Sequence, residues 1–122
     1  MKKVLIVEDD ALISEMYSNK FKEVGFEVVL AKDGEEAIVR TKETNPDLIL
    51  LDVVLPKKDG FEVLEEIKKD PALKNIKIVF LTNLSEGENI NRGLNSEADA
   101  YLVKAHSTPS QIVEKVKEIM GE

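Results

Sequence analysis

Short apolar runs alternate with segments of helical spacing along the chain, and this alternation constrains the fold more than any other feature. Three of the runs, around Leu5, Leu50 and Val79, are apolar at nearly every position. Such runs are typical of strands that are buried on both faces of a parallel sheet. The second and fifth runs are shorter and are expected at the edges of the sheet. We predict strands over residues 4–7, 28–31, 48–51, 76–81 and 100–103.

A segment with helical character follows each run. The last helix is expected to begin with Thr108 as its N-cap, Pro109 at the first helical position and Gln111 completing a capping box. The fourth segment, "SEGENINRGLNSEA" (85–98), contains two glycines, so we expect a weakly stable helix there. In the first helix, which Gly25 should end, the apolar residues at helical spacing are Ile13, Met16, Tyr17, Phe21 and Val24.

Five β-α repeats joined by right-handed crossovers place helices on both faces of the sheet. The sequence therefore predicts a doubly wound α/β fold. Its 122 residues suit one domain with one core, and 43% hydrophobic with 34% charged residues describe a globular chain. We expect a single domain over 1–122 with no output domain. In such folds the ligand site lies beyond the carboxyl ends of the strands.

Composition excludes several classes of site. The chain has no cysteine, so thiolate metal sites are absent, and a lone His106 cannot form a histidine metal site. The net charge of −7 argues against direct nucleic-acid binding. No apolar run approaches the roughly 18 residues of a membrane span, and the N-terminus does not resemble a signal peptide. A cytoplasmic location is the default expectation.

Polar residues follow four of the predicted strands. Because carboxyl ends of parallel strands meet at one edge, these side chains should lie together. Several carboxylates that share a pocket repel one another, and a hard divalent cation such as Mg²⁺ would compensate them. Taken singly, each residue is more often a helix cap or a surface side chain, and Asp10 in particular suits an N-cap. The residues are Glu8, Asp9 and Asp10, then Asp52, then Thr82 and Asn83, and finally Lys104.

The motifs at these strand ends resemble the receiver domains of two-component response regulators of the chemotaxis-regulator type. They are "VLIVEDD" (4–10), "PDLILLDVVLPKKDGFEVL" (46–64), "IVFLTN" (78–83) and "ADAYLVKA" (98–105), and the resemblance covers essentially the whole chain. It implies a flavodoxin-like (βα)5 three-layer sandwich with strand order 2-1-3-4-5.

The resemblance also implies a phosphorelay function. Asp52 would accept a phosphoryl group from a histidine kinase or a histidine phosphotransfer protein. Asp9 would bind Mg²⁺ directly, with Mn²⁺ as a possible substitute, and Glu8 would act largely through water. The carbonyl of Val54 and the carboxylate of Asp52 would complete the protein's ligands. The domain would signal without being a dedicated enzyme.

Three further residues receive roles from the resemblance. Lys104 would pair with the acyl phosphate, Thr82 would hydrogen-bond a phosphoryl oxygen, and Tyr101 would move inward with Thr82. The face built from 85–98, 100–103 and the last helix would contact a downstream protein or output domain, or a second copy of the chain.

The chain departs from the family pattern at three positions. Asn83 stands where a small residue is usual, and it is expected to alter access or hydrogen bonding at the phosphoryl site. Ala105 replaces a proline that follows the family's lysine in a cis peptide. Because a cis bond before a non-proline residue costs about 2.5–4 kcal/mol, we predict a trans bond and some rearrangement of Lys104 or its loop. Glu8 replaces the commoner Asp.

Two alternatives remain open at this point. The first is a pseudo-receiver that acts as a phosphorylation-independent interaction module. Asn83 and Ala105 keep this alternative open, although the presence of Asp52, Thr82 and Lys104 argues against it. The second is an aspartyl phosphatase of the haloacid dehalogenase type, which would need a second Asp where this chain has Val54. Nucleotide binding lacks support, because no glycine-rich phosphate loop occurs.

Overall fold

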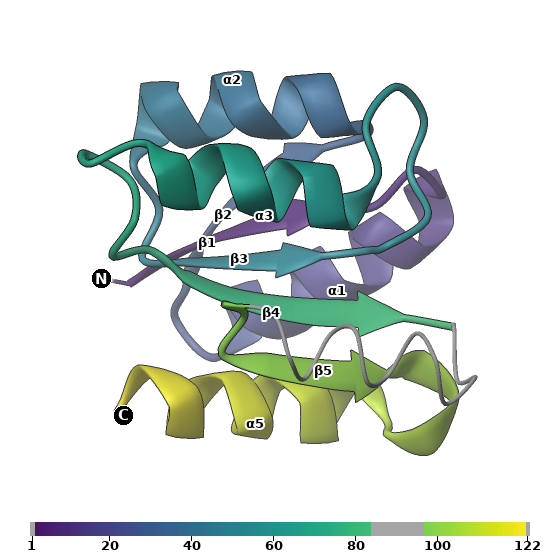
Figure 1. The fold of residues 1–122 in the computed structure, drawn as a ribbon. Helices are drawn as coiled ribbons and strands as arrows, with labels where there is room; N and C mark the ends of the chain where they lie inside the picture. The colour runs from purple at the N-terminus through teal and green to yellow at the C-terminus, as the bar shows by residue number, and fades with distance from the viewer. Residues whose placement is uncertain (1, 84–96, 122) are drawn as a thin grey trace.

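The computed structural model describes residues 2–83 and 97–121, which form five strands and the helices that pack on them (Figure 1). The helix predicted over 85–98 lies almost entirely outside these residues. The elements are β1 (Lys3–Val7), α1 (Ala11–Glu23), β2 (Glu27–Ala31), α2 (Gly34–Thr44), β3 (Leu48–Leu51), α3 (Gly60–Lys69), β4 (Lys77–Thr82), β5 (Ala100–Val103), the 3-10 turn η1 (Lys104–His106) and α5 (Pro109–Met120).

The five strands form one parallel sheet in the order β2-β1-β3-β4-β5, which confirms the predicted fold and strand order. The two shorter runs, β2 and β5, are the edge strands. The registers pair Val7 with Leu51, and Leu51 with Phe80. The strands therefore end at a common edge, and residues 8, 52, 82 and 104 follow or close them there.

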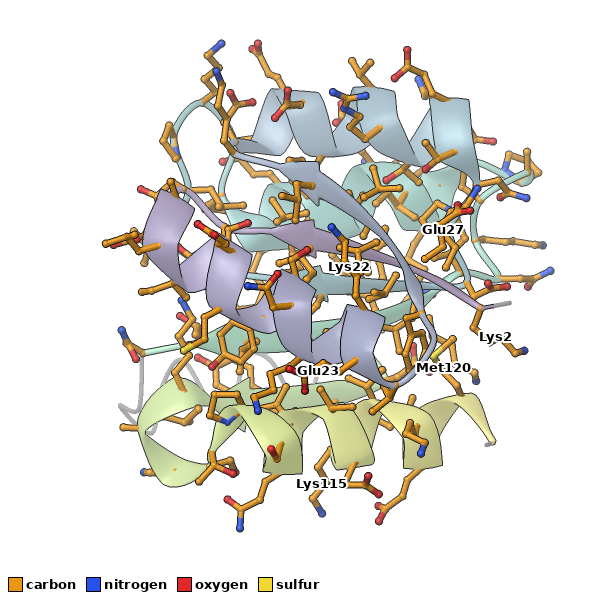
Figure 2. The ribbon with its side chains drawn as sticks, turned by 180° about the vertical axis from the view of Figure 1, so that it is seen from behind. Lys2, Lys22, Glu23, Glu27, Lys115 and Met120 are labelled. Carbon is orange, nitrogen blue, oxygen red and sulfur yellow. The ribbon has the colours of Figure 1, made fainter. Side chains whose placement is uncertain are left out.

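Alternate residues of the strands face two separate cores. Leu5, Ile49 and Phe80 pack with α2 and α3 on one face of the sheet. Val4, Ile6 and Leu50 pack with α1 and α5 on the other. Figure 1 shows α2 and α3 together above the sheet, and Figure 2 shows the opposite side with α1 in front of the strands and α5 below them. None of the helices in the described part of the chain is long and apolar enough to cross a membrane.

The ends of the helices follow from local sequence. Asp10 is the N-cap of α1, where its carboxylate accepts hydrogen bonds from the amides of Leu12 and Ile13. The predicted capping box of α5 is present, with Thr108 and Gln111 bonded reciprocally. Gly25 lies just beyond α1 with φ of +93°, a conformation that glycine adopts at little cost.

The apolar face predicted for α1 is partly wrong. Tyr17 and Phe21 are buried, but Met16 and Val24 are 41% and 47% exposed. Ser14 and Ser18 take the buried positions instead, because the stripe facing the sheet runs through 14, 17, 18 and 21. Met16 and Val24 lie beside this stripe. Hydrophobic spacing alone did not reveal that two small polar residues fill it.

Candidate functional site

The carboxyl edge of the sheet encloses a cavity of about 320 Å³ in which the polar strand-end residues meet. The segment after β1 contributes acids, the end of β4 contributes a hydroxyl, and the turn after β5 contributes an ammonium group. The lining residues are Glu8, Asp9, Asp10, Ile13, Asp52, Val54, Thr82, Asn83 and Lys104. Seven of these were singled out from the sequence as strand-end residues, and Val54 entered through the family resemblance.

Asp52 lies one residue beyond β3, whose four residues are all buried. Its backbone amide donates to the carbonyl of Val7 at 3.2 Å, so the residue is held in line with the strand. Its side chain is only 10% exposed. One carboxylate oxygen accepts from the amide of Val54 at 3.2 Å, and the other lies 3.1 Å from Nζ of Lys104. The strand therefore delivers a buried carboxylate whose two oxygens are already oriented.

Glu8 is held in a similar way beside it. Its amide donates to the carbonyl of Ala31 at 3.0 Å, which continues the pairing of β1 with β2. One carboxylate oxygen accepts from the amide of Asp10 at 3.1 Å, and the other bonds to Nζ of Lys104. Asp9, next in the chain, is exposed at the cavity. The two consecutive acids thus differ: one is buried and paired with a lysine, and the other is open to solvent.

Lys104 begins the turn η1, and its side chain is 10% exposed. The described residues contain no cis peptide, as predicted for the bond before Ala105. The Lys104–His106 turn forms in this loop, yet Nζ still reaches both Glu8 and Asp52. Proline after the lysine is therefore not required to bring the ammonium group to the acids.

Burial and charge shift the pKa values of this pair. Burial is the main cause that raises the pKa of Glu8, against the opposing effect of its hydrogen bonds with Lys104 and the Asp10 amide. Burial also acts to lower the pKa of Lys104, but the hydrogen bond to Glu8 and the charge of Asp52 outweigh it and raise that pKa. Lys104 is thus an ammonium ion at neutral pH, and one positive charge faces three carboxylates.

The three carboxylates suit a divalent cation. Glu8, Asp9 and Asp52 each offer one oxygen, and these atoms lie within 4.8 Å of one another. An all-oxygen donor set at the mouth of a water-accessible cavity matches the preferences of Mg²⁺ and Mn²⁺. Val54, whose carbonyl is a ligand implied by the family resemblance, lines the same cavity. The residues present therefore fit the cation that the fold implies.

The two predicted switch residues lie at different distances from the cavity. Thr82, at the end of β4, is 1% exposed and lines it. Tyr101, on β5, is half-buried and packs its ring on Phe80 with centroids 5.8 Å apart. Burial first, and the charge of Asp52 second, raise the pKa of Tyr101, which does not line the cavity. Asn83 is exposed at the rim.

Sequence reasoning missed one wall of the site. Ile13, in the first turn of α1, lines the cavity together with the acids. It was assigned to the apolar face of the helix, and it does pack partly against that core. Its position one turn after the strand-end acids is the signal that could have placed it at the cavity.

Comparison with known proteins agrees with the observed fold and with the acidic site at its carboxyl edge. Residues 4–117 match the family model of the response regulator receiver domain. The phosphate regulon transcriptional regulatory protein PhoB of Escherichia coli (strain K12) is 37% identical over 119 residues, covering 98% of this chain and 52% of PhoB. The chain thus spans about half the length of the first curated relatives it matches.

Two solved structures are similar over nearly the whole chain. The receiver domain of the Francisella response regulator 1452 has a TM-score of 0.90 at 30% identity, covering 99% of this chain and 98% of that one. The Mn²⁺-bound form of the response regulator Rcp1 has a TM-score of 0.83 at 32% identity, covering 97% and 93%.

Proposed function

The chain belongs to the response regulator receiver family, and we propose from this premise that it accepts a phosphoryl group on Asp52 from a histidine kinase or a histidine phosphotransfer protein. One observation carries the proposal. The Asp52 carboxylate lies 3.1 Å from Nζ of Lys104, in a cavity that it shares with Glu8 and Asp9. The candidate nucleophile Asp52, the ammonium group of Lys104 and the candidate metal-ligating oxygens of Glu8 and Asp9 thus lie within one site.

In the proposed reaction an oxygen of Asp52 attacks the phosphorus of a phosphohistidine, the P–O bond forms, and the P–N bond breaks to release the imidazole. Such a transfer depends mainly on positioning and charge stabilisation. Nζ of Lys104 stabilises the phosphoryl oxygens, and the Thr82 hydroxyl donates a hydrogen bond to one of them. The Val54 amide holds one Asp52 oxygen, and Nζ of Lys104 lies 3.1 Å from the other, which is the proposed attacking atom.

A divalent cation, Mg²⁺ or Mn²⁺, would supply further neutralisation of the transferred group when bound. Glu8, Asp9, Asp52 and the Val54 carbonyl are the proposed ligands. The three carboxylates already carry more negative charge than Lys104 offsets, and the transferred phosphoryl group brings further negative charge. The proposed transfer therefore requires the cation.

The proposed output is a contact with another protein. Thr82 would move toward the phosphoryl group, and Tyr101 would follow on the adjacent strand. The proposed contact face consists of β5, α5 and the helix predicted over 85–98, most of which lies outside the described residues. It would bind a target, an output domain or a second copy of the chain. Ile112 and Val116 of α5 are fully buried, so the face would use other residues of this helix.

We propose that residues 1–122 form one receiver domain that works in the cytoplasm without binding nucleic acid or membrane itself. It is a signalling module and not a turnover enzyme, because the phosphoryl group stays on the protein until hydrolysis or onward transfer. The net charge of −7 argues against nucleic acid as the target.

The test is phosphorylation by a small donor. Acetyl phosphate with millimolar Mg²⁺ should add one phosphoryl group to the wild type, read by intact mass. Asp52→Ala should remain unmodified, and chelation of Mg²⁺ should abolish labelling of the wild type. A folded wild type that takes no phosphate, and does not respond to beryllofluoride, would instead be a pseudo-receiver. The exposed Asn83 at the rim is the observation that favours this second function.

A further inference from the structure

The loop between β3 and α3, residues 53–59, is held at both ends by glycines that touch backbone. Gly60 directly follows the loop and contacts the backbone of the acceptor residue, Asp52. A Cβ added to Gly60 would overlap the Asp52 carbonyl oxygen and lie 2.9 Å from Cα of Val53. Its amide donates to the Val53 carbonyl at 2.8 Å. This contact fixes the first part of the loop to α3.

The second contact comes from a different element, the first turn of α2. A Cβ added to Gly34 would overlap the carbonyl oxygen of Lys58 and lie 2.8 Å from its carbonyl carbon. The Gly34 amide donates to the carbonyl of Pro56 at 3.2 Å. Figure 1 shows the loop after β3 rising to the start of α2 before it enters α3. Only glycine permits the helix to approach the loop this closely.

Between these contacts the loop has a strained backbone at Lys57, and the Lys57 side chain forms ion pairs with acids at the start of α2. Lys57 has φ of +70°, which is costly for a residue with a side chain. Its Nζ lies 3.8 Å from Asp33 and 3.9 Å from Glu35. Asp33 is buried and caps α2 by accepting from the amide of Glu36 at 2.7 Å. The start of α2 therefore contacts the loop in two ways. The Gly34 backbone bonds to the loop backbone, and Asp33 and Glu35 pair with Lys57.

The acceptor depends on where this loop lies. The Val54 amide donates to Asp52, yet the Val54 side chain is 60% exposed and so contributes little packing to fix its own backbone. We infer that Gly34 is a positioning residue of the acceptor site: it lets α2 hold loop 53–59 so that the Val54 backbone stays against the Asp52 carboxylate. The consequence for metal binding and phosphorylation rests on the function proposed above.

The test is Gly34→Ala, examined without any phosphodonor first. The added methyl group should displace the loop, so amide hydrogen exchange at Val54 should accelerate and Mg²⁺ affinity, followed by amide shifts in an NMR titration, should fall about tenfold. Phosphorylation by acetyl phosphate should slow accordingly. The Val54 exchange rate is read in metal-free protein and does not require the proposed function.

Gly25→Ala is the matched control. Gly25 has φ of +93° and open space around it, so alanine there destabilises the fold through backbone strain at the α1–β2 turn. It should leave Mg²⁺ affinity and Val54 exchange at wild-type values. Gly34→Ala with equal loss of stability but unchanged Mg²⁺ affinity and Val54 exchange would overturn the inference.

Asp33→Ala serves if Gly34→Ala does not fold. It removes the cap of α2 without adding a group at the contact, so the first turn should fray and shift both readouts in the same direction. Wild-type values in this variant would also overturn the inference. A wild type that binds no Mg²⁺ and takes no phosphate would reject the proposed function, while faster Val54 exchange in Gly34→Ala would still support the positional role.

Discussion

A lysine contacts several oxygen atoms at each end of the parallel strands, Lys3 at the amino end (the amino edge) and Lys104 at the carboxyl end (the carboxyl edge). The two arrangements differ in how deeply they are buried. At the amino edge the backbone amide of Lys3 donates to Asp47 at 2.7 Å, and its Nζ donates to the Thr44 carbonyl at 2.8 Å and pairs with Glu27 at 3.3 Å. The Lys3 and Glu27 side chains are 28% and 53% exposed. At the carboxyl edge Lys104 and Glu8 are 10% and 6% exposed. Glu27 marks the amino edge in Figure 2.

The difference separates a structural arrangement from a functional one. Lys3 donates a hydrogen bond to the carbonyl of Thr44 at the end of α2 and links the starts of the strands through Asp47 and Glu27. Water screens the interaction of Lys3 with these acids. Both ion-pair partners of Lys104 are buried carboxylates, and Asp9 adds a third negative charge nearby. Residue types alone would not distinguish the two edges. What marks the carboxyl edge is a buried surplus of negative charge, which a bound cation would offset.

The largest expected effect is the loss of stability on removing Lys104, compared with the loss on removing Lys3. Lys104→Met leaves two buried carboxylates without their cation, so in Mg²⁺-free buffer the free energy of unfolding should fall by about 3 kcal/mol. Lys3→Met breaks an exposed pair and should cost at most about 1 kcal/mol. Urea denaturation of both variants measures the contrast.

Mg²⁺ sharpens this contrast. Saturating Mg²⁺ should restore part of the stability lost in Lys104→Met and none of that lost in Lys3→Met. Labelling by acetyl phosphate should also slow roughly 100-fold in Lys104→Met alone, since one stabilising charge at the transferred group is lost. Equal losses of stability in the two variants would show that burial does not distinguish the edges.

A smaller effect is expected from the metal itself. At about 100 times its dissociation constant, Mg²⁺ should raise the free energy of unfolding of the wild type by about 2.7 kcal/mol. In Asp9→Asn a tenfold weaker affinity would reduce this gain to about 1.4 kcal/mol at the same concentration. Asp47→Asn, at the amino edge, should keep the full gain. Thermal or urea unfolding with and without chelator measures all three, and an undiminished gain in Asp9→Asn would remove Asp9 from the ligands.

The sequence predicted the sheet well because β1, β3 and β4 are buried on both faces, which leaves uninterrupted apolar runs. It also placed Glu8, Asp9, Asp52, Thr82 and Lys104 at one edge, since strand direction fixes where strands end. Contacts across elements were not predictable in this way. The bond from Lys104 to Glu8 and the approach of Gly34 to Lys58 depend on tertiary packing, which no local spacing encodes.

The smallest expected effect concerns the two tyrosines, the only ones in the chain, which report how far the charge of the carboxyl edge extends. Burial is the main cause that raises the pKa of both Tyr17 and Tyr101 above the usual 10, and the charge of Asp52 adds to the shift at Tyr101. Because the folded-state pKa values are raised, the stability linked to these groups is fully present below pH 10 and is lost as pH rises through the folded values.

Ultraviolet titration of tyrosinate, in native buffer and in urea, tests this. The chain has no tryptophan to interfere. Native midpoints should lie above the urea midpoint near 10. Asp52→Asn should lower the Tyr101 midpoint while leaving it above 10, because burial remains, and Asp47→Asn at the amino edge should shift neither tyrosine. A native midpoint equal to that in urea would contradict the burial on which the shift depends. A response to Asp47→Asn would show instead that the two edges share one electrostatic field.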